Sequence, residues 1–378
     1  MINSTNNKTV LILTARFGAG HISAANAIKD YLLEEDASMN VMIRDFINVS
    51  VPIMNNPMVS LYESNTKYTP SLYNFYYYLK KAFNSKYDLA HRLYTPKLTE
   101  YILDVKPDIV ISTFPLASAC LHNIKTKYPK INLPTVTVIT DVVDSLEWVY
   151  STTDMYFVPS IEVKNRFIQK GISANKFKVT GVPINKKFLA DKPSSLSNKR
   201  KLLLLGGGRG LFDINEDFMY WIDNFLDSHS HSVEVTIVTG KNQKLYDLLT
   251  TNKPVKHIKV LGFVTNMDEL IKEHDLIITK PGGATLFEAI HAQTPVAVKL
   301  PKIGQEIENS KFIIDKGIGL VYYNTLDLED IFNSLLTDEF NDIVLYLQKG
   351  ISDFKSTLHI ENIYQYISDL IESKKVNY

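Results

Sequence analysis

The stretch LIITKPGGATLFE, residues 276–288, predicts a strand, a glycine turn and a helix in immediate succession. Residues 276–279 are an apolar run typical of a buried parallel strand, and residues 284–290 have a helical pattern without Gly or Pro. Two glycines before a helix leave backbone N–H groups free at the positive end of its dipole, which suits an anion such as phosphate. Glu288 lies about one turn inside this helix, where it could bind ribose hydroxyls. The alternative is an ordinary glycine turn that binds nothing.

The composition of the chain is that of an ordinary globular protein. Its 378 residues suffice for two domains, and 45% hydrophobic and 22% charged residues are typical values. A formal net charge of zero argues against nucleic acid as a partner. The single cysteine, Cys120, excludes an intramolecular disulfide framework and a Cys-based zinc site, and its apolar surroundings favour packing. We find no signal peptide and no apolar run of the roughly 20 residues that span a membrane, so we expect a cytoplasmic protein with peripheral membrane contact at most.

The first half opens with a strand, a helix and a second strand. Residues 10–14 predict the first strand, residues 15–21 a glycine loop, residues 23–35 an amphipathic helix and residues 40–45 the second strand. This order predicts a parallel sheet. The loop resembles a dinucleotide fingerprint only weakly, because its third glycine is missing and His21 follows the second.

Further strands of the first half predict where a ligand crevice lies. We expect them at residues 108–112, 135–140 and 155–160, with helices at about 115–121 and 162–171. Because the carboxyl ends of parallel strands face the crevice, Thr113 and Asp141 are crevice candidates. Asp141 could equally cap a helix. Residues 191–200 are polar and without pattern, which indicates an interdomain linker.

Residues 52–101 interrupt this alternation with a segment rich in Tyr, Phe and Lys. Basic residues outnumber acidic ones across it. Aromatic rings and lysines suit the headgroup region of an anionic bilayer, so we expect peripheral membrane contact there. The candidate residues for this contact are Tyr76, Tyr77, Lys80, Lys81 and Phe83. The alternative is a pair of helices packed on the sheet with half-buried tyrosines.

The second half restarts the α/β pattern at residues 201–210, a strand that runs directly into glycines. Residues 296–300 predict a later strand, followed by a loop that carries Gln305 and Glu306. Two closing amphipathic helices are expected at about residues 327–336 and 360–373. Two β-α-β domains, each with glycine at a strand end, therefore predict a two-domain enzyme that uses a nucleotide.

Four short motifs occur in a fixed order: TARFGAGHISAA at residues 14–25, GFVTNM at 262–267, TKPGGATLFE at 279–288 and GQEIEN at 304–309. Their order and spacing resemble those of the monogalactosyldiacylglycerol synthase and processive diacylglycerol glucosyltransferase family. The second half also resembles, more distantly, the peptidoglycan lipid N-acetylglucosaminyltransferase. The resemblance implies a GT-B fold, in which two Rossmann-like α/β domains face each other across a cleft. It also implies inverting transfer of a hexose from a UDP-sugar to a lipid hydroxyl, of the diacylglycerol type, at the cytoplasmic face of the membrane.

The same resemblance assigns a part to each region of the chain. Residues 1–190 would form the domain that faces the acceptor and the membrane, and residues 191–200 the linker. Residues 201–355 would bind the nucleotide-sugar donor. Residues 356–378 would form a helix that could cross back to the N-terminal domain.

The resemblance also implies a role for individual residues. It implies that Glu288 binds the ribose and that Gly282, Gly283 and Thr285 bind the diphosphate, with Gly207 and Gly208 on its other side. It also implies that the backbone of Phe263 and Val264 binds the uracil. Gln305 and Glu306 would bind the sugar hydroxyls. It makes His21 the general base or a group that assists the departing diphosphate, with Asp141 as a second catalytic candidate. A histidine suits this proton transfer, and glycine N–H groups can stabilise departing UDP without a metal. The chain has no D-x-D motif, and we expect no cofactor beyond the UDP-sugar substrate.

Two positions depart from the family pattern. Arg209 stands where the family commonly has an acidic residue, and Ser145 stands where a histidine usually precedes Trp148. Three alternatives therefore stay open: a same-fold transferase with a polyprenyl or other acceptor, a UDP-sugar epimerase, and a non-catalytic UDP-sugar-binding protein. The G-x-G-H motif around His21 and the Tyr/Lys-rich segment favour the lipid transferase over the epimerase.

Overall fold

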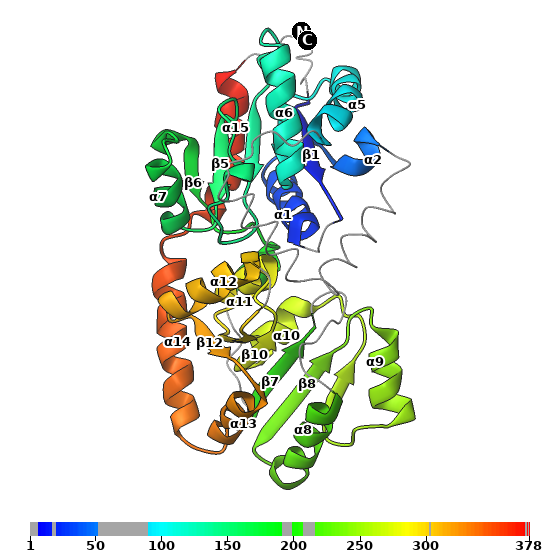
Figure 1. Cartoon of the computed structure of the whole chain (residues 1–378), viewed down its shortest axis with the longest axis vertical. Coiled ribbons are helices and arrows are strands. Elements are labelled where there is room, and N and C mark those ends of the chain that lie inside the picture. Colours follow the sequence, from blue (N-terminus) through cyan, green and yellow to red (C-terminus); the bar gives the residue numbers. More distant parts are fainter. Residues whose placement is uncertain are drawn as a thin grey trace. The chain divides into compact units, whose positions relative to one another are not determined.

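Two compact units make up the chain (Figure 1). The computed structural model describes residues 7–16, 20–51, 90–190, 199–206, 216–301, 304–374, 376 and 378. The first unit holds the residues up to Lys186 together with Ile303–Gln305 and Thr357–Tyr378, and the second holds Lys187–Lys302 and Glu306–Ser356. Each unit contains one six-stranded parallel sheet. The predicted α/β class with parallel sheets is confirmed.

The sheet of the first unit has the strand order β2-β1-β3-β4-β5-β6. Its strands are β1 (Thr9–Thr14), β2 (Asn40–Asp45), β3 (Ile109–Ser112), β4 (Thr135–Val138), β5 (Met155–Val158) and β6 (Phe177–Val179). Its helices are α1 (Gly20–Glu35), α2 (Phe46–Ser50), α5 (Ala90–Val105), α6 (Pro115–Lys127), α7 (Ile161–Gln169) and α15 (Ile363–Ser373), with short 3₁₀ turns η2 (Leu146–Trp148), η3 (Ala174–Lys176) and η6 (Ile360–Asn362). Central strands such as β1 are buried almost throughout, as expected of a sheet that helices cover on both faces.

Helix α15 belongs to the first unit although it is the last helix of the chain. Its buried residues Ile363, Ile367 and Ile371 are spaced four apart, so they form one apolar stripe. The Tyr366 ring lies 6.2 Å from the ring of Phe157 on β5. Figure 1 shows α15, in red, beside β5, so a segment from the end of the chain completes a unit that begins near residue 9.

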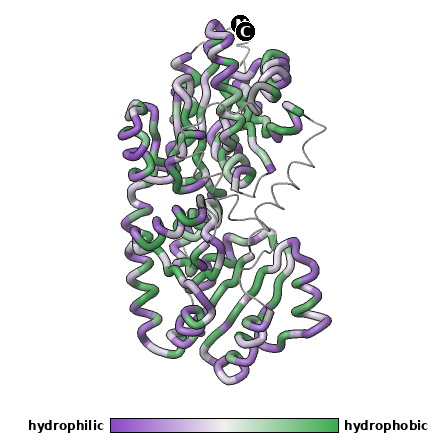
Figure 2. The backbone as a smooth tube through the Cα atoms, viewed as in Figure 1, coloured by the Kyte–Doolittle hydropathy of each residue, from purple (hydrophilic) through white to green (hydrophobic). Residues whose placement is uncertain are grey.

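The sheet of the second unit has the strand order β12-β11-β10-β7-β8-β9. Its strands are β7 (Arg200–Leu205), β8 (Val233–Val238), β9 (Lys259–Leu261), β10 (Leu276–Thr279), β11 (Val296–Lys299) and β12 (Gly319–Tyr322). Its helices are α8 (Glu216–His229), α9 (Gln243–Asp247), α10 (Met267–Glu273), α11 (Gly283–His291), α12 (Gly304–Asp315), α13 (Thr325–Ser334) and α14 (Glu339–Lys355), with a 3₁₀ turn η4 (Lys186–Leu189) at its start and a π turn η5 (Leu248–Asn252) after α9. In both units the strands are hydrophobic, whereas the helices alternate hydrophobic and hydrophilic residues (Figure 2).

Several elements differ from the sequence-based prediction. The strands β6 and β12 and the helix α14 had no predicted counterpart. Helix α1 begins at Gly20 rather than near residue 23, so His21 lies in the first turn of a helix and not in a loop. Gln305 and Glu306 lie in the first turn of α12, so the prediction of a loop at these residues is wrong. Helix α6 extends six residues beyond the expected end at 121, to Lys127.

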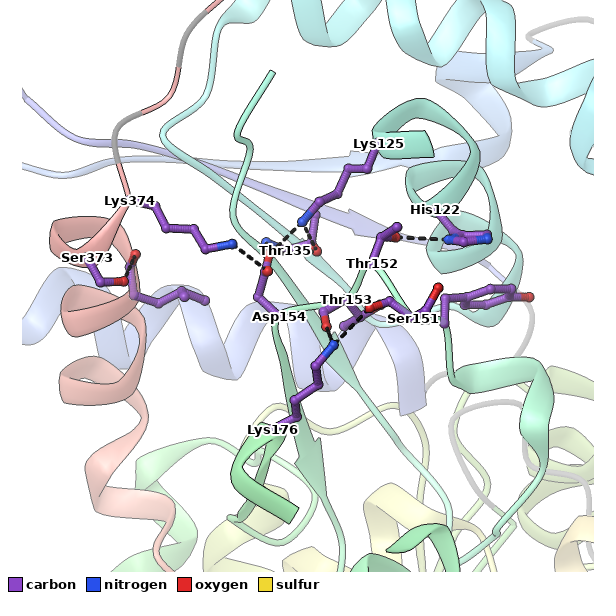
Figure 3. Close-up of polar contacts among 12 residues, drawn as sticks. His122, Lys125, Thr135, Ser151, Thr152, Thr153, Asp154, Lys176, Ser373 and Lys374 are labelled. Atoms are coloured by element: carbon purple, nitrogen blue, oxygen red, sulfur yellow. Dashed lines mark hydrogen bonds and ion pairs between the residues drawn. The ribbon is translucent and has the colours of Figure 1, made fainter. Parts of the chain in front are cut away.

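A partly buried ion-pair network joins the end of the chain to the amino-terminal edge of the first sheet (Figure 3). Asp154, directly before β5, accepts from Lys125 of α6 and from Lys374, which follows α15, at 2.6 Å each. It also accepts from the backbone N–H of Thr135 at 2.8 Å. Burial disfavours the charge on Asp154, but these three donors outweigh it and hold the pKa of the carboxyl below its usual range. A carboxylate that joins three segments in this way holds the C-terminal segment on the first unit.

We predict that Asp154→Asn destabilises the first unit by about 2 kcal/mol, between the costs of breaking an exposed and a buried pair, because it leaves Lys125 and Lys374 without their partly buried counter-charge. The measurement is urea unfolding at pH 7, where the carboxylate is ionised. A Trp221→Phe background leaves Trp148 of the first unit as the fluorescent reporter, since the chain has two tryptophans. The control is Glu100→Gln, which removes the exposed 2.7 Å ion pair with Lys97 and should cost less than about 0.5 kcal/mol. Equal effects of the two substitutions would contradict the prediction.

Candidate functional site

Both sheets contain a switch point, where the chain changes its direction of winding across the sheet. In the first sheet this point lies between the neighbouring strands β1 and β3, and in the second between β7 and β10. Ligands of doubly wound α/β folds bind beyond the carboxyl ends of the strands at such a point. The residues that follow β1, β3, β7 and β10 are therefore the first place to look for chemistry.

His21 is held by residues that follow β3 and β4, the next two strands after β1 in the sheet order. Its Nδ1 lies 3.0 Å from Oγ1 of Thr140, which follows β4, and its carbonyl accepts from Oγ1 of Thr113, which follows β3, at 3.1 Å. The Phe114 ring meets the imidazole edge-on at 5.5 Å, and the Trp148 ring lies 6.1 Å away. These contacts from two strand ends and one 3₁₀ turn fix the imidazole at the carboxyl edge of the first sheet.

Burial of the imidazole lowers the pKa of His21 to about 4, and a hydrogen bond between the ring and the backbone of Thr113 opposes that shift only in part. The ring is therefore neutral at pH 7. A neutral imidazole has one nitrogen that carries a proton and one with a free lone pair. Thr140 contacts the ring at Nδ1, and the backbone of Thr113 is a second hydrogen-bond partner of the ring.

The other candidate residues of the first unit follow the carboxyl end of β4. Asp141 directly follows Thr140, and the backbone N–H of Val143 donates to its carbonyl at 2.8 Å. Ser145 and Trp148 are both buried, and Trp148 forms a wall of the His21 environment. Sequence reasoning missed Thr140 itself, although its place directly before Asp141 at the end of a strand was a usable signal.

The glycine turn of the second unit lies at the other switch point. It follows β10, and α11 begins at Gly283 with Gly282 as its cap residue. The buried Asn309 of α12 donates from Nδ2 to the Pro281 carbonyl at 2.7 Å, which fixes the turn from behind. The first N–H groups of a helix have no acceptor within the helix, so those of α11 can bind an anion.

Neither backbone strain nor packing against the described residues requires a glycine at position 282. Its φ is −80°, which any residue adopts, and a Cβ built there would meet no described atom within 4 Å. By contrast, a Cβ at Gly319 would come within 2.3 Å of the Val296 carbonyl oxygen, so packing requires that glycine. Close approach of a ligand to the backbone is a physical reason for glycine at position 282.

Glu288 is in the second turn of α11. Burial raises the pKa of its carboxyl to about 7, so the group is close to half-ionised at neutral pH. Thr285 lies three residues earlier on the same helix and is partly exposed. A desolvated carboxyl one turn behind an anion-binding helix start is the arrangement that the sequence predicted.

The remaining donor candidates also lie at carboxyl ends of the second sheet. Phe263 and Val264 follow β9, and the Phe263 ring is 63% exposed, with Nζ of Lys241 5.7 Å from its centroid. Gln305 and Glu306 open α12, which follows β11, and both are partly buried. The structure therefore places these residues along the same edge of the sheet as Glu288.

Several predicted residues lie outside the part of the chain that the structure describes. They are Tyr76, Tyr77, Lys80, Lys81, Phe83, Gly207, Gly208 and Arg209. Cys120 is described and lies in the core, where burial raises the pKa of its thiol to about 12, so it serves packing. Among the described residues, no three His, Cys, Asp or Glu side chains gather as metal ligands would. None of the described helices has the length and apolarity needed to cross a membrane.

Comparison with known proteins identifies the family. Residues 21–184 match the model of monogalactosyldiacylglycerol (MGDG) synthase, and residues 202–361 match the glycosyltransferase family 28 C-terminal domain. A processive diacylglycerol β-glucosyltransferase of Bacillus pumilus is 33% identical, over 98% of this chain and 97% of that protein. The chain belongs to this glycosyltransferase family. The enzyme of the same description from Bacillus subtilis is 31% identical, over 94% of this chain and 92% of its own length.

Solved structures agree on the fold of this family member. MurG of Acinetobacter baumannii has a TM-score of 0.58 at 14% identity, and the match covers 97% of this chain and 100% of that one. MnaA of S. aureus, solved with UDP, has a TM-score of 0.61 at 14% identity, covering 98% of this chain. At such identities the likeness establishes the fold alone, which is the two-domain GT-B fold. The predicted GT-B fold and family are confirmed, and the chain is a glycosyltransferase.

His291, the last residue of α11, is a buried titratable group next to the donor candidates. Its side chain is 3% exposed, and neither ring nitrogen has a hydrogen-bond partner among the described residues. Burial, with a smaller contribution from the positive charge of Lys355, lowers the pKa of His291 to about 3. The imidazole is thus buried in its neutral form.

We predict that His291 makes the second unit acid-sensitive. Its pKa is lower when folded than when unfolded, so the unfolded state binds more protons and stability falls as the pH drops below about 6.5. The expected slope is about 1.4 kcal/mol per pH unit between pH 6 and 5. His291→Met should reduce the slope by about this amount in urea unfolding of a Trp148→Phe background, in which Trp221 reports on the second unit. His274, whose pKa burial also lowers, keeps its own contribution. Substitution of the exposed His231 by Gln should leave the slope intact, and an unchanged slope in H291M would refute the assignment.

Proposed function

We propose that this glycosyltransferase moves a hexose from a UDP-sugar to the hydroxyl of a diacylglycerol-type lipid, with inversion and without a metal, at the cytoplasmic membrane surface. The relatives named above are diacylglycerol β-glucosyltransferases, which supports the lipid acceptor and favours glucose. Their similarity extends over nearly the whole chain, which favours lipid transfer over a UDP-sugar epimerase of the same fold. The Tyr/Lys-rich segment at residues 52–101 is the proposed membrane contact, and residues 52–89 of it lie outside the described residues.

The donor half of the proposal depends mainly on Gly282. The open space in front of this glycine and the free N–H groups of α11 suit the diphosphate, and Glu288 one turn further suits the ribose. Phe263 follows β9, three strands away from β10 in the same sheet, or about 14 Å at the usual strand spacing. An extended nucleoside diphosphate can span that distance, which supports uracil near Phe263 and phosphate near Gly282.

In the proposed reaction the lipid hydroxyl oxygen attacks C1 of the sugar as the bond from C1 to the UDP oxygen breaks. The hydroxyl proton passes to the imidazole of His21, and UDP leaves with the electron pair of the broken bond. A neutral imidazole can accept this proton, although its low pKa makes it a weak base in the empty site. The negative charge that develops on departing UDP favours the protonated ring and would raise this pKa during the reaction.

The decisive experiment measures UDP release with UDP-glucose, UDP-galactose or UDP-N-acetylglucosamine and vesicles that contain diacylglycerol. We predict release with at least one donor, dependent on diacylglycerol, and a loss of at least about 100-fold in kcat for His21→Ala. UDP affinity should change little, because His21 is not a donor-binding residue. His122→Ala is the matched control, since His122 lies in the same unit with its ring bonded to Thr152. UDP binding without release from any donor would refute the transferase, and release by H21A would remove His21 as base.

We further predict that affinity for the UDP-sugar rises between pH 6 and pH 8. With a pKa of about 7, Glu288 is mostly protonated at the lower pH and mostly ionised at the higher one. An ionised carboxylate accepts stronger hydrogen bonds from the ribose hydroxyls. UDP-glucose is the better probe, because the terminal phosphate of UDP itself titrates near pH 6. Titration calorimetry should show that Glu288→Gln removes the pH dependence of UDP-glucose affinity and weakens binding about 10-fold. If the affinity of E288Q still changed with pH, Glu288 would be excluded as the source of the dependence.

A further inference from the structure

The outward face of α14 carries two exposed apolar side chains at its centre. Leu345 is 64% exposed and Tyr346 is 69% exposed, in the middle of a helix that spans Glu339–Lys355. The opposite face holds the buried residues of the helix, which are Phe340, Leu347, Ile351 and Phe354. Helix α14, in orange in Figure 1, therefore packs on the second unit with one face and presents an apolar pair on the other.

A groove extends this apolar surface from α14 to the edge strand β12. Its lining includes Ile314 of α12, Leu320 of β12 and Tyr346 of α14, and Ile314 is itself 54% exposed. Two carboxylates of α14, Glu339 and Asp342, also line the groove. A continuous exposed apolar surface is typical of a contact with another molecule. The carboxylates disfavour an anionic bilayer as that partner.

Charges of opposite sign flank the apolar pair on the same face of the helix. Asp342 lies three residues before Leu345, Lys349 lies three residues after Tyr346, and both charged residues are exposed. A separation of seven residues is close to two helical turns, so Asp342 and Lys349 project in nearly the same direction. A second α14 laid antiparallel on this face, with a two-fold axis between positions 345 and 346, would bring each Asp342 level with Lys349 of the other copy.

We propose that α14 forms the interface of a symmetric homodimer, in which the helices of two copies pack antiparallel. Leu345 and Tyr346 lie near the two-fold axis and meet their own counterparts there. Asp342 and Lys349 form an ion pair on each side of the apolar centre, which fixes the direction and register of the two helices. The face is thus complementary to itself, as a two-fold contact requires. This inference does not depend on the proposed function.

The ends and the size of the contact indicate a weak dimer. Asp338 would lie level with Asp353 of the other copy, and Arg200, 3.7 Å from Asp338, offsets part of that repulsion. An interface made by one helix and one groove from each copy is small by the standard of stable complexes. We therefore expect a dissociation constant of about 10 to 100 μM and an equilibrium between monomer and dimer.

Analytical ultracentrifugation of the full-length chain between about 1 and 300 μM tests the dimer. The weight-average mass should rise with concentration from that of a monomer toward twice that value. Asp342→Lys and Lys349→Asp should each weaken association at least about 10-fold, because each brings like charges together at two symmetric places. An equimolar mixture of D342K and K349D should associate about as well as the wild type, because each variant supplies the charge that the other lacks.

Asp330→Lys is the matched control for the change of charge. Asp330 is exposed on the preceding helix, α13, and its substitution alters the net charge as much as D342K does. It should leave the dissociation constant within about 2-fold of the wild-type value. The urea midpoints of all three variants should match the wild type, since exposed residues contribute little to folding, and this shows that a loss of association is not a loss of fold.

The mixing experiment decides the geometry. A wild-type chain that stays monomeric at every concentration would overturn the proposal, and so would a dimer that D342K and K349D leave intact. Two monomeric variants that do not associate when mixed would overturn the antiparallel arrangement. A monomeric chain that binds phosphatidylcholine vesicles, and loses that binding in Leu345→Ser, would assign this face to lipid instead of a second copy.

Discussion

The hydrogen-bond ladders of the two parallel sheets are the constraint on which both candidate sites depend. Parallel pairing brings the carboxyl ends of all strands in a sheet to the same edge. His21, Thr113 and Thr140 meet at such an edge although they lie 92 and 119 residues apart in sequence. The turn at Gly282 and Glu288 occupies the equivalent edge of the second sheet. Register slips in these ladders would therefore affect the sites before they affect the core.

Desolvation is the second common property of the sites, and it acts in opposite directions on the two titratable groups. It lowers the pKa of His21 to about 4 and raises that of Glu288 to about 7. In both cases the neutral form is favoured in the unliganded protein. On the proposed function, helix N–H groups such as those at the start of α11 would balance much of the negative charge of a bound nucleotide.

The sequence predicted the central strands and the donor turn well, because buried strands give unbroken apolar runs. It failed at the edges of both sheets. Strand β6 has three residues, and β12, an edge strand that begins at Gly319, has too short an apolar run to be distinguished from a loop. Helix α14 contains Gly350, whose Cβ position would lie 2.3 Å from the Gly317 carbonyl oxygen. That close approach is a tertiary contact, which no local pattern reveals. Thr140 was missed for a similar reason, because its partner lies more than a hundred residues away in sequence.

Three glycines show which causes can be read from the sequence and which require the structure. In the sequence, Gly282, Gly319 and Gly350 are equivalent, each a small residue near the end of an element or within it. The structure separates them, because backbone atoms crowd the Cβ positions of Gly319 and Gly350, whereas the space beside Gly282 is open. Packing explains the first two, and neither packing nor backbone strain explains the third. Neither backbone strain nor the described packing requires a glycine there, and ligands of such folds bind at switch points, which supports the proposal that the turn after β10 binds a ligand.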